Sequence, residues 1–151
     1  MATRSTIALE FADGTVQQVY CHWDGYLENN GQILRDNYSN PFKLRELIDL
    51  GDISSLKPEV GVAHPFGYFG TDITAEDYEA KYGEMTTFYG RDRGETGTGA
   101  KKFADYADYV ENFIHEEYAY ILRKDGNWYV KCHSADFVTL AEAFEAQKET
   151  A

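Results

Sequence analysis

The residue types best suited to molecular recognition gather in one short segment, Tyr20-Cys21-His22-Trp23-Asp24-Gly25-Tyr26. Tryptophan and tyrosine combine a large apolar surface with a polar tip, and histidine can donate or accept a hydrogen bond. The segment stands where a predicted strand gives way to a loop, a common place for binding residues. We therefore predict a binding pocket or an interface anchor formed by Tyr20, His22, Trp23, Asp24 and Tyr26. The plainer alternative is that Trp23 covers the core beside Tyr26 while Asp24-Gly25 makes a turn.

Cysteine and histidine side chains raise the question of metal binding and catalysis. Two dipeptides, Cys21-His22 and Cys132-His133, supply the side chains of a tetrahedral zinc site. Adjacent residues in a strand point to opposite faces, however, so we interpret both cysteines as small buried side chains. A metal-dependent hydrolase using His22 and Asp24 stays an alternative, although no spacing in the chain fixes a catalytic geometry. We assign no catalytic residue, no metal ligand and no cofactor.

Carboxylates at helical spacing are the second feature that could bind a partner. They fall in three predicted helices, where residues three or four apart lie about 5–6 Å from each other. Rows of charge at that spacing can imitate a nucleic-acid backbone and occupy the basic groove of a DNA- or RNA-binding protein. Ordinary solvated helix faces look the same. The predicted acidic surface comprises Glu76, Asp77, Glu79, Asp105, Asp108, Glu111, Glu142 and Glu145.

Local patterns predict an α+β fold in which two β-hairpins form an antiparallel sheet packed with about four helices. Asp-Gly dipeptides mark both hairpin turns, between residues 6–11 and 15–21 and between residues 118–123 and 127–133. Helices are predicted over residues 32–38, 41–50, 103–114 and 135–147, and one further turn over 52–56. The helix at 41–50 has the clearest boundaries, with Asn40 as N-cap, Pro41 at the first position and Gly51 after the last.

The segment 57–102 is predicted to be irregular and rich in loops, because glycines interrupt it and the hydrophobic periodicity fades. Thr74 can begin a short acidic helix that reaches about Tyr82. Gly94 to Lys101 superficially resembles a phosphate-binding loop, but Ala100 separates the last glycine from the lysine, which breaks that motif. We expect a flexible loop there.

Charge and composition limit the class of protein and the partners it can bind. With 26 acidic and 14 basic residues the net charge is −12, so direct binding to nucleic acid or to an anionic membrane would start against repulsion. A length of 151 residues suits one acidic domain, and two cysteines give no disulfide framework. No signal core or membrane span is apparent, so we expect a cytoplasmic protein. The sequence does not decide whether the protein forms a homo-oligomer.

The segment Asp13-Gly14 to Tyr26, together with residues 47–56, resembles small uncharacterised proteins of tailed-bacteriophage genomes that have a YCHWDGY-like segment. The resemblance covers roughly the N-terminal third. It implies an accessory protein acting in the host cytoplasm, and it transfers no activity and no functional residue.

The resulting functional hypothesis is a phage-type accessory protein that acts by binding a host protein with a basic surface. Small acidic phage proteins often mimic nucleic acid, so the partner would belong to host defence, such as a nuclease, restriction or CRISPR component. A small-molecule or nucleotide binder using the His22-Trp23-Tyr26 cluster is the first alternative, and the metal-dependent hydrolase is the second.

Overall fold

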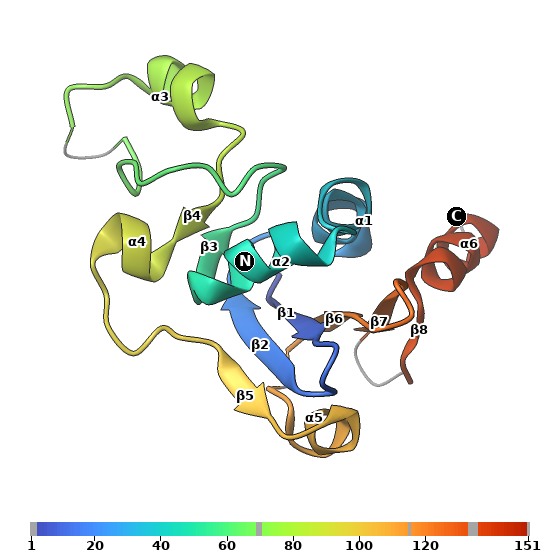
Figure 1. The fold of residues 1–151 in the computed structure, drawn as a ribbon. Helices are drawn as coiled ribbons and strands as arrows, with labels where there is room; N and C mark the ends of the chain where they lie inside the picture. Colours follow the sequence, from blue (N-terminus) through green and yellow to red (C-terminus); the bar gives the residue numbers. More distant parts are fainter. Residues whose placement is uncertain (1–2, 69–70, 115, 133–135, 151) are drawn as a thin grey trace.

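Two β-hairpins form the centre of the computed structural model, which describes residues 3–68, 71–114, 116–132 and 136–150 (Figure 1). The first joins β1 (Ser5–Glu10) to β2 (Val16–Cys21), and the second joins β6 (Tyr118–Leu122) to β7 (Trp128–Cys132). At the turns, Gly14 and Gly126 have φ of +92° and +85°, a conformation that glycine adopts without steric cost. Both hairpin predictions are confirmed.

The hairpins pair through their first strands, and that pairing is parallel. Residues Ser5 to Leu9 of β1 lie in register with Tyr118 to Leu122 of β6. The prediction of an antiparallel sheet is therefore wrong: the fold is α+β, but its sheet is mixed. All six residues of β1 are buried, as expected for a strand with parallel pairing that is covered on both faces.

Short strands extend this centre to the order β4-β3-β2-β1-β6-β7-β8 within the described residues. They are β3 (Ile53–Ser55), β4 (Thr87–Phe88) and β8 (Val138–Thr139), while β5 (Lys101–Phe103) pairs with the first half of β2. The predicted helical turn over residues 52–56 is wrong. Gly51, with φ of +87°, reverses the chain so that Ile53 pairs with Cys21 instead.

One face of the sheet is covered by α1 (Gln32–Asn37), α2 (Pro41–Asp49) and α6 (Leu140–Thr150). A π-helical turn, Leu27–Gly31, precedes α1. Side chains from alternate strand positions, such as Ile7 and Leu9, pack against these helices in the larger core cluster. Asn40 caps α2 by accepting a hydrogen bond from the N–H of Phe42, as predicted. The predicted helix over 135–147 begins only at Leu140; Ala135 lies outside the described residues.

The other face is covered by α5 (Tyr106–Asn112), whose buried Tyr109 packs on Ala8 and Ile121 within the smaller cluster. The sequence predicted a longer helix over 103–114. Phe103 instead belongs to β5, Asp105 begins the helix as its N-cap, and Val110 is 42% exposed. Because the cap sets the helix start and rotation, Tyr109 takes the central core position.

The segment 57–102 has little regular structure, as predicted. It contains α3 (Ala75–Tyr82), capped by Thr74, and the single-turn α4 (Tyr89–Arg93). The described part has six α-helices: the four predicted outside this segment, the short helix predicted from Thr74, and α4, which was not predicted. Figure 1 shows α3 away from the sheet, and no residue of α3 is buried. Among the described residues, no helix is long and apolar enough to cross a membrane.

Candidate functional site

The structure brings three of the five predicted binding residues into contact at the end of β2. The Tyr20 hydroxyl lies 2.7 Å from Nδ1 of His22. The rings of His22 and Trp23 meet edge to face, with centroids 4.7 Å apart. Trp23 is 45% exposed, so a large part of its surface is open to solvent. We refer to Tyr20, His22 and Trp23, with Asp24 and Tyr26 on the following turn, as the aromatic cluster.

Hydrogen bonds fix the backbone of the aromatic cluster. The N–H groups of His22 and Trp23 donate to the carbonyls of Ile53 and Ser54, each at 3.0 Å, which extends the pairing of β2 with β3. Asp24 adopts a left-handed conformation with φ of +55°, which aspartate tolerates better than most residues. A rigid turn therefore presents the exposed side chains.

Backbone hydrogen bonds of Gly25 hold the turn in place. Its N–H donates to the carbonyl of Thr3 at 2.8 Å, and its carbonyl accepts from the Tyr120 hydroxyl at 2.6 Å. A Cβ atom at this position would lie 2.6 Å from the Cβ of Ser5, closer than side chains tolerate. Only glycine fits, and the next residue, Tyr26, is held at the surface with 37% of its side chain exposed. No ring contact joins Tyr26 to the other aromatic members within the described chain.

Charged groups surround the aromatic cluster. Asp24 and Glu28 are exposed, and Glu116 and Arg4 are close enough to Tyr20 to influence its hydroxyl. Burial raises the pKa of Tyr20, the positive charge of Arg4 opposes that shift, and Glu116 adds to it. The Tyr20 hydroxyl therefore stays protonated and available to His22 at neutral pH.

No family model, curated protein or solved structure matches this chain. The resemblance to tailed-phage proteins therefore stays a prediction, and the local geometry must support any functional conclusion.

The two cysteines cannot share a metal or form a disulfide in this fold. Cys21, Ser5, Tyr118 and Cys132 stand in one row across four neighbouring strands, which places the two cysteines about 14 Å apart. Cys21 is fully buried, and burial raises the pKa of its thiol to about 11. The interpretation as a small buried side chain is confirmed for Cys21, whereas Cys132 is only partly buried, and His133 lies outside the described residues.

The structure offers the hydrolase alternative no metal-holding group of side chains. Across residues 3–68, 71–114, 116–132 and 136–150, no three histidine, cysteine or carboxylate side chains converge as a metal site. His22 is engaged by the Tyr20 hydroxyl, and Asp24 stands on an exposed turn.

The predicted acidic residues lie in three separate parts of the molecule. Figure 1 shows α3, α5 and α6 at well-separated corners around the sheet. Several of the carboxylates also have structural roles: Asp105 accepts from the N–H of Asp108, Asp108 accepts from the N–H of Ala104, and Glu142 accepts from the Thr139 hydroxyl. These contacts cap the helices. Because the three helices lie apart, their acidic rows do not form one continuous array.

A buried polar network in the irregular segment is a feature that the sequence did not predict. The Asp92 carboxylate is fully buried and accepts from the N–H groups of His64 and Phe88 at 3.1 and 2.8 Å. The Arg91 guanidinium pairs with it at 3.0 Å and also donates to the carbonyls of Val60 and Thr86. This network fastens the strand-poor segment around residues 60–64 to α4.

Thr87, His64 and Asp92 carry the hydroxyl, base and acid of a catalytic triad and lie close together. Nε2 of His64 lies 3.2 Å from the Thr87 hydroxyl, but Nδ1 lies 2.7 Å from the Val62 carbonyl and 3.7 Å from Asp92. The backbone carbonyl thus takes the place of the acid, and the Thr87 side chain is buried. The arrangement stabilises structure and does not expose a nucleophile. His64 and Asp92 stand 28 residues apart without a shared motif, so no local signal predicts them.

Proposed function

We propose that this protein acts by binding a host protein with a basic surface, and that the aromatic cluster is the anchor of that interface. The observation that supports this most directly is Trp23, a large side chain left 45% exposed on a backbone fixed by β3 and Thr3. Tryptophan and tyrosine are enriched among the few residues that dominate binding energy in protein interfaces. A rigid anchor loses little conformational freedom on binding.

The charge of the chain determines the kind of partner. A net charge of −12 favours encounter with a positively charged surface, and Asp24 and Glu28 place negative charge beside the anchor. Because the three acidic helices are dispersed, their charge acts as a general attractive field and not as a replica of a nucleic-acid backbone. The phage resemblance adds that the partner belongs to host defence, such as a basic nuclease, restriction or CRISPR component.

The test is a pull-down from host lysate at about 50 mM and about 500 mM salt, a range over which screening removes most long-range attraction. We expect a specific partner that is retained at low salt and released at high salt. Trp23→Ala should abolish its capture. Phe42→Ala is the matched control, because Phe42 is also an exposed aromatic residue but lies at the opposite end of β1 and β2. Equal capture by the wild type and Trp23→Ala at both salt concentrations would refute the proposal.

Charge reversal tests the electrostatic contribution separately. Glu79→Lys, Glu111→Lys and Glu145→Lys each reverse an exposed charge in one of the three helices without removing a helix cap. If the three helices act only through their summed negative charge, each variant should slow association with the partner modestly, and the effects of the three variants should add. Loss of capture by one variant alone would instead indicate a localised acidic contact on that helix.

A further inference from the structure

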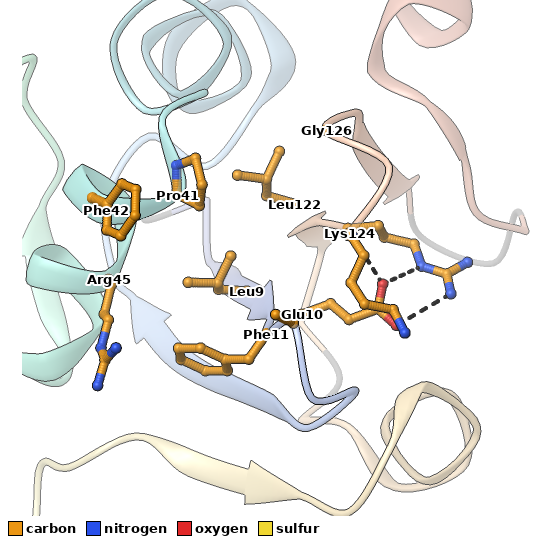
Figure 2. Close-up of a pocket in the computed structure, with 11 residues that line it drawn as sticks. Leu9, Glu10, Phe11, Pro41, Phe42, Arg45, Leu122, Lys124 and Gly126 are labelled. Carbon is orange, nitrogen blue, oxygen red and sulfur yellow. Dashed lines mark hydrogen bonds and ion pairs between the residues drawn. The ribbon is translucent and has the colours of Figure 1, made fainter.

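A pocket lies at the other end of the sheet from the aromatic cluster. It is a pocket of about 440 Å³, within the range of small-molecule sites. Both hairpin turns and the first turn of α2 enclose it, and we call it the turn pocket (Figure 2). Its apolar lining consists of Leu9, Phe11, Pro41, Phe42 and Leu122.

The rim of the turn pocket is positively charged, whereas the chain as a whole is negatively charged. Among its lining residues three are basic, Arg45, Arg123 and Lys124, and one is acidic, Glu10, whereas acidic residues outnumber basic ones by 26 to 14 in the chain. Glu10 is already neutralised by Arg123, whose Nε lies 3.0 Å from its carboxylate. Arg45 and Lys124 are the two rim cations outside this ion pair, and the charge of Lys124 also lowers the pKa of Glu10 and of Asp13.

Both cations are accessible to a ligand. Figure 2 shows Arg45 on α2 at one side of the pocket and Lys124 on the second turn at the other. The contact of Arg45 with Asp49 is 3.9 Å long and more than half exposed on both sides, so a bound anion can compete with it. Within the described chain the Lys124 ammonium has no ion-pair partner at 4 Å or less.

The apolar part of the pocket is incompletely covered. Phe42 stands at its mouth with 79% of the residue exposed, the largest exposure of any big apolar side chain described. A second hollow of about 310 Å³ shares Gly126 with the turn pocket and is lined by Trp128 and Leu140. The two adjoining hollows suit an elongated ligand better than a compact one.

We propose that the turn pocket binds an amphiphilic carboxylate, with an aliphatic chain on Leu9, Phe11, Phe42 and Leu122 and the carboxylate attracted to the basic rim formed by Arg45 and Lys124. Apolar burial supplies most of the affinity, since each methylene removed from water is favourable. The two cations select an anionic head group over a neutral or cationic one. This site is independent of the aromatic cluster, so either proposal can fail without the other.

Three ligands with the same chain test the head-group selection: octanoate, 1-octanol and octylammonium. Affinities are measured by titration calorimetry, and the site by amide chemical shifts in the isotope-labelled protein. We expect saturable binding of octanoate below about 1 mM, weaker binding of octanol and none of octylammonium. The shifts should concentrate in residues 9–12, 41–45 and 122–126.

Surface variants then separate the head group from the chain. Arg45→Gln with Lys124→Gln should weaken octanoate by about tenfold and leave octanol nearly unchanged. Lys81→Gln with Lys148→Gln makes the same charge change elsewhere on the exposed surface and should alter neither. Phe42→Ala should weaken both ligands. Absence of saturable octanoate binding, shifts outside the turn pocket, or equal octanoate affinity in the two double variants would overturn the proposal.

Discussion

Glu10 and Arg123, 113 residues apart, join the two hairpins at their turns: Nε of Arg123 donates to the Glu10 carboxylate at 3.0 Å. The carboxylate also accepts from the N–H of Lys124 at 3.0 Å. The guanidinium lies 3.5 Å from the ring centroid of Tyr106, which places it between the strand ends and α5. One ion pair thus connects β1, the turn after β6 and the helix on the second face.

Glu10→Gln should destabilise the protein by about 1–3 kcal/mol, because it removes the charge partner of a half-buried guanidinium. Chemical denaturation at pH 7 measures this loss. Glu46→Gln, an exposed change on α2, is the matched control and should stay within about 0.5 kcal/mol of the wild type. Equal stability of the two variants would contradict the role assigned to Glu10.

The same pair predicts a pH dependence. Burial alone would raise the pKa of Glu10, but the hydrogen bonds and charges of Arg123 and Lys124 outweigh it, and the net pKa is lowered from 4.5. A depressed folded-state pKa stabilises the protein above the unfolded-state pKa, and this contribution is lost as pH falls through the folded-state value. The stability difference between the wild type and Glu10→Gln should therefore narrow below about pH 4.5. Chemical denaturation of the wild type and of Glu10→Gln at pH 3 and at pH 7 measures this difference.

Two fully buried tyrosines should respond oppositely to removal of their hydroxyl groups. The Tyr38 hydroxyl donates to the Lys57 carbonyl at 2.8 Å, whereas the Tyr109 hydroxyl is buried without a partner among the described residues. Tyr38→Phe should lose about 0.5–1.5 kcal/mol, the net value of one hydrogen bond. Tyr109→Phe should be neutral or more stable, since it removes an unsatisfied polar group from the core. Thermal denaturation ranks the pair, and a greater loss in Tyr109→Phe would show an undetected partner.

Features set by neighbouring residues could be predicted from the sequence. Both Asp-Gly turns and the Asn40-Pro41 helix start depend on contacts within a few residues, and the structure confirms them. The parallel pairing of β1 with β6 depends on residues more than 100 positions apart, and strands of two or three residues such as β4 have no period to detect. The position of Tyr109 was missed because Asp105 sets where α5 begins.

The candidate sites also differ in whether neighbouring or distant residues form them. Tyr20, His22 and Trp23 fall within four consecutive residues, so composition alone indicated a cluster, although its exposure depends on hydrogen bonds to β3 and Thr3. The turn pocket combines residues of three distant segments, and the network of Asp92 joins others 28 positions apart. Neither has a local sequence pattern.

Asp92→Ala should loosen the irregular segment by about 3–5 kcal/mol, because it removes the ion-pair partner of the Arg91 guanidinium and leaves two buried N–H groups without their acceptor. Hydrogen exchange of the native protein resolves the effect by residue. Protection should fall around Thr86 to Phe88, while amides of β1 and β6 serve as an internal reference. Asp72→Ala, an exposed change nearby in sequence, should leave both regions unaltered. Uniform loss of protection throughout the sheet would show that the segment does not open separately.

Gly51 and Gly94 end α2 and α4 with left-handed backbones, φ of +87° and +77°, and differ in their surroundings. A Cβ atom on Gly51 would overlap the carbonyl oxygen of Thr98, which also accepts from the N–H of Asp52 at 2.8 Å. No atom lies within 4 Å of a Cβ on Gly94. Gly94→Ala should therefore cost only the left-handed strain, about 1–2 kcal/mol. Gly51→Ala should cost about 4 kcal/mol or more, since it also displaces the 94–100 loop from α2. Urea denaturation measures the free energy of unfolding of both variants. Similar losses would mean that Thr98 can move away from the added methyl group without destabilising the protein.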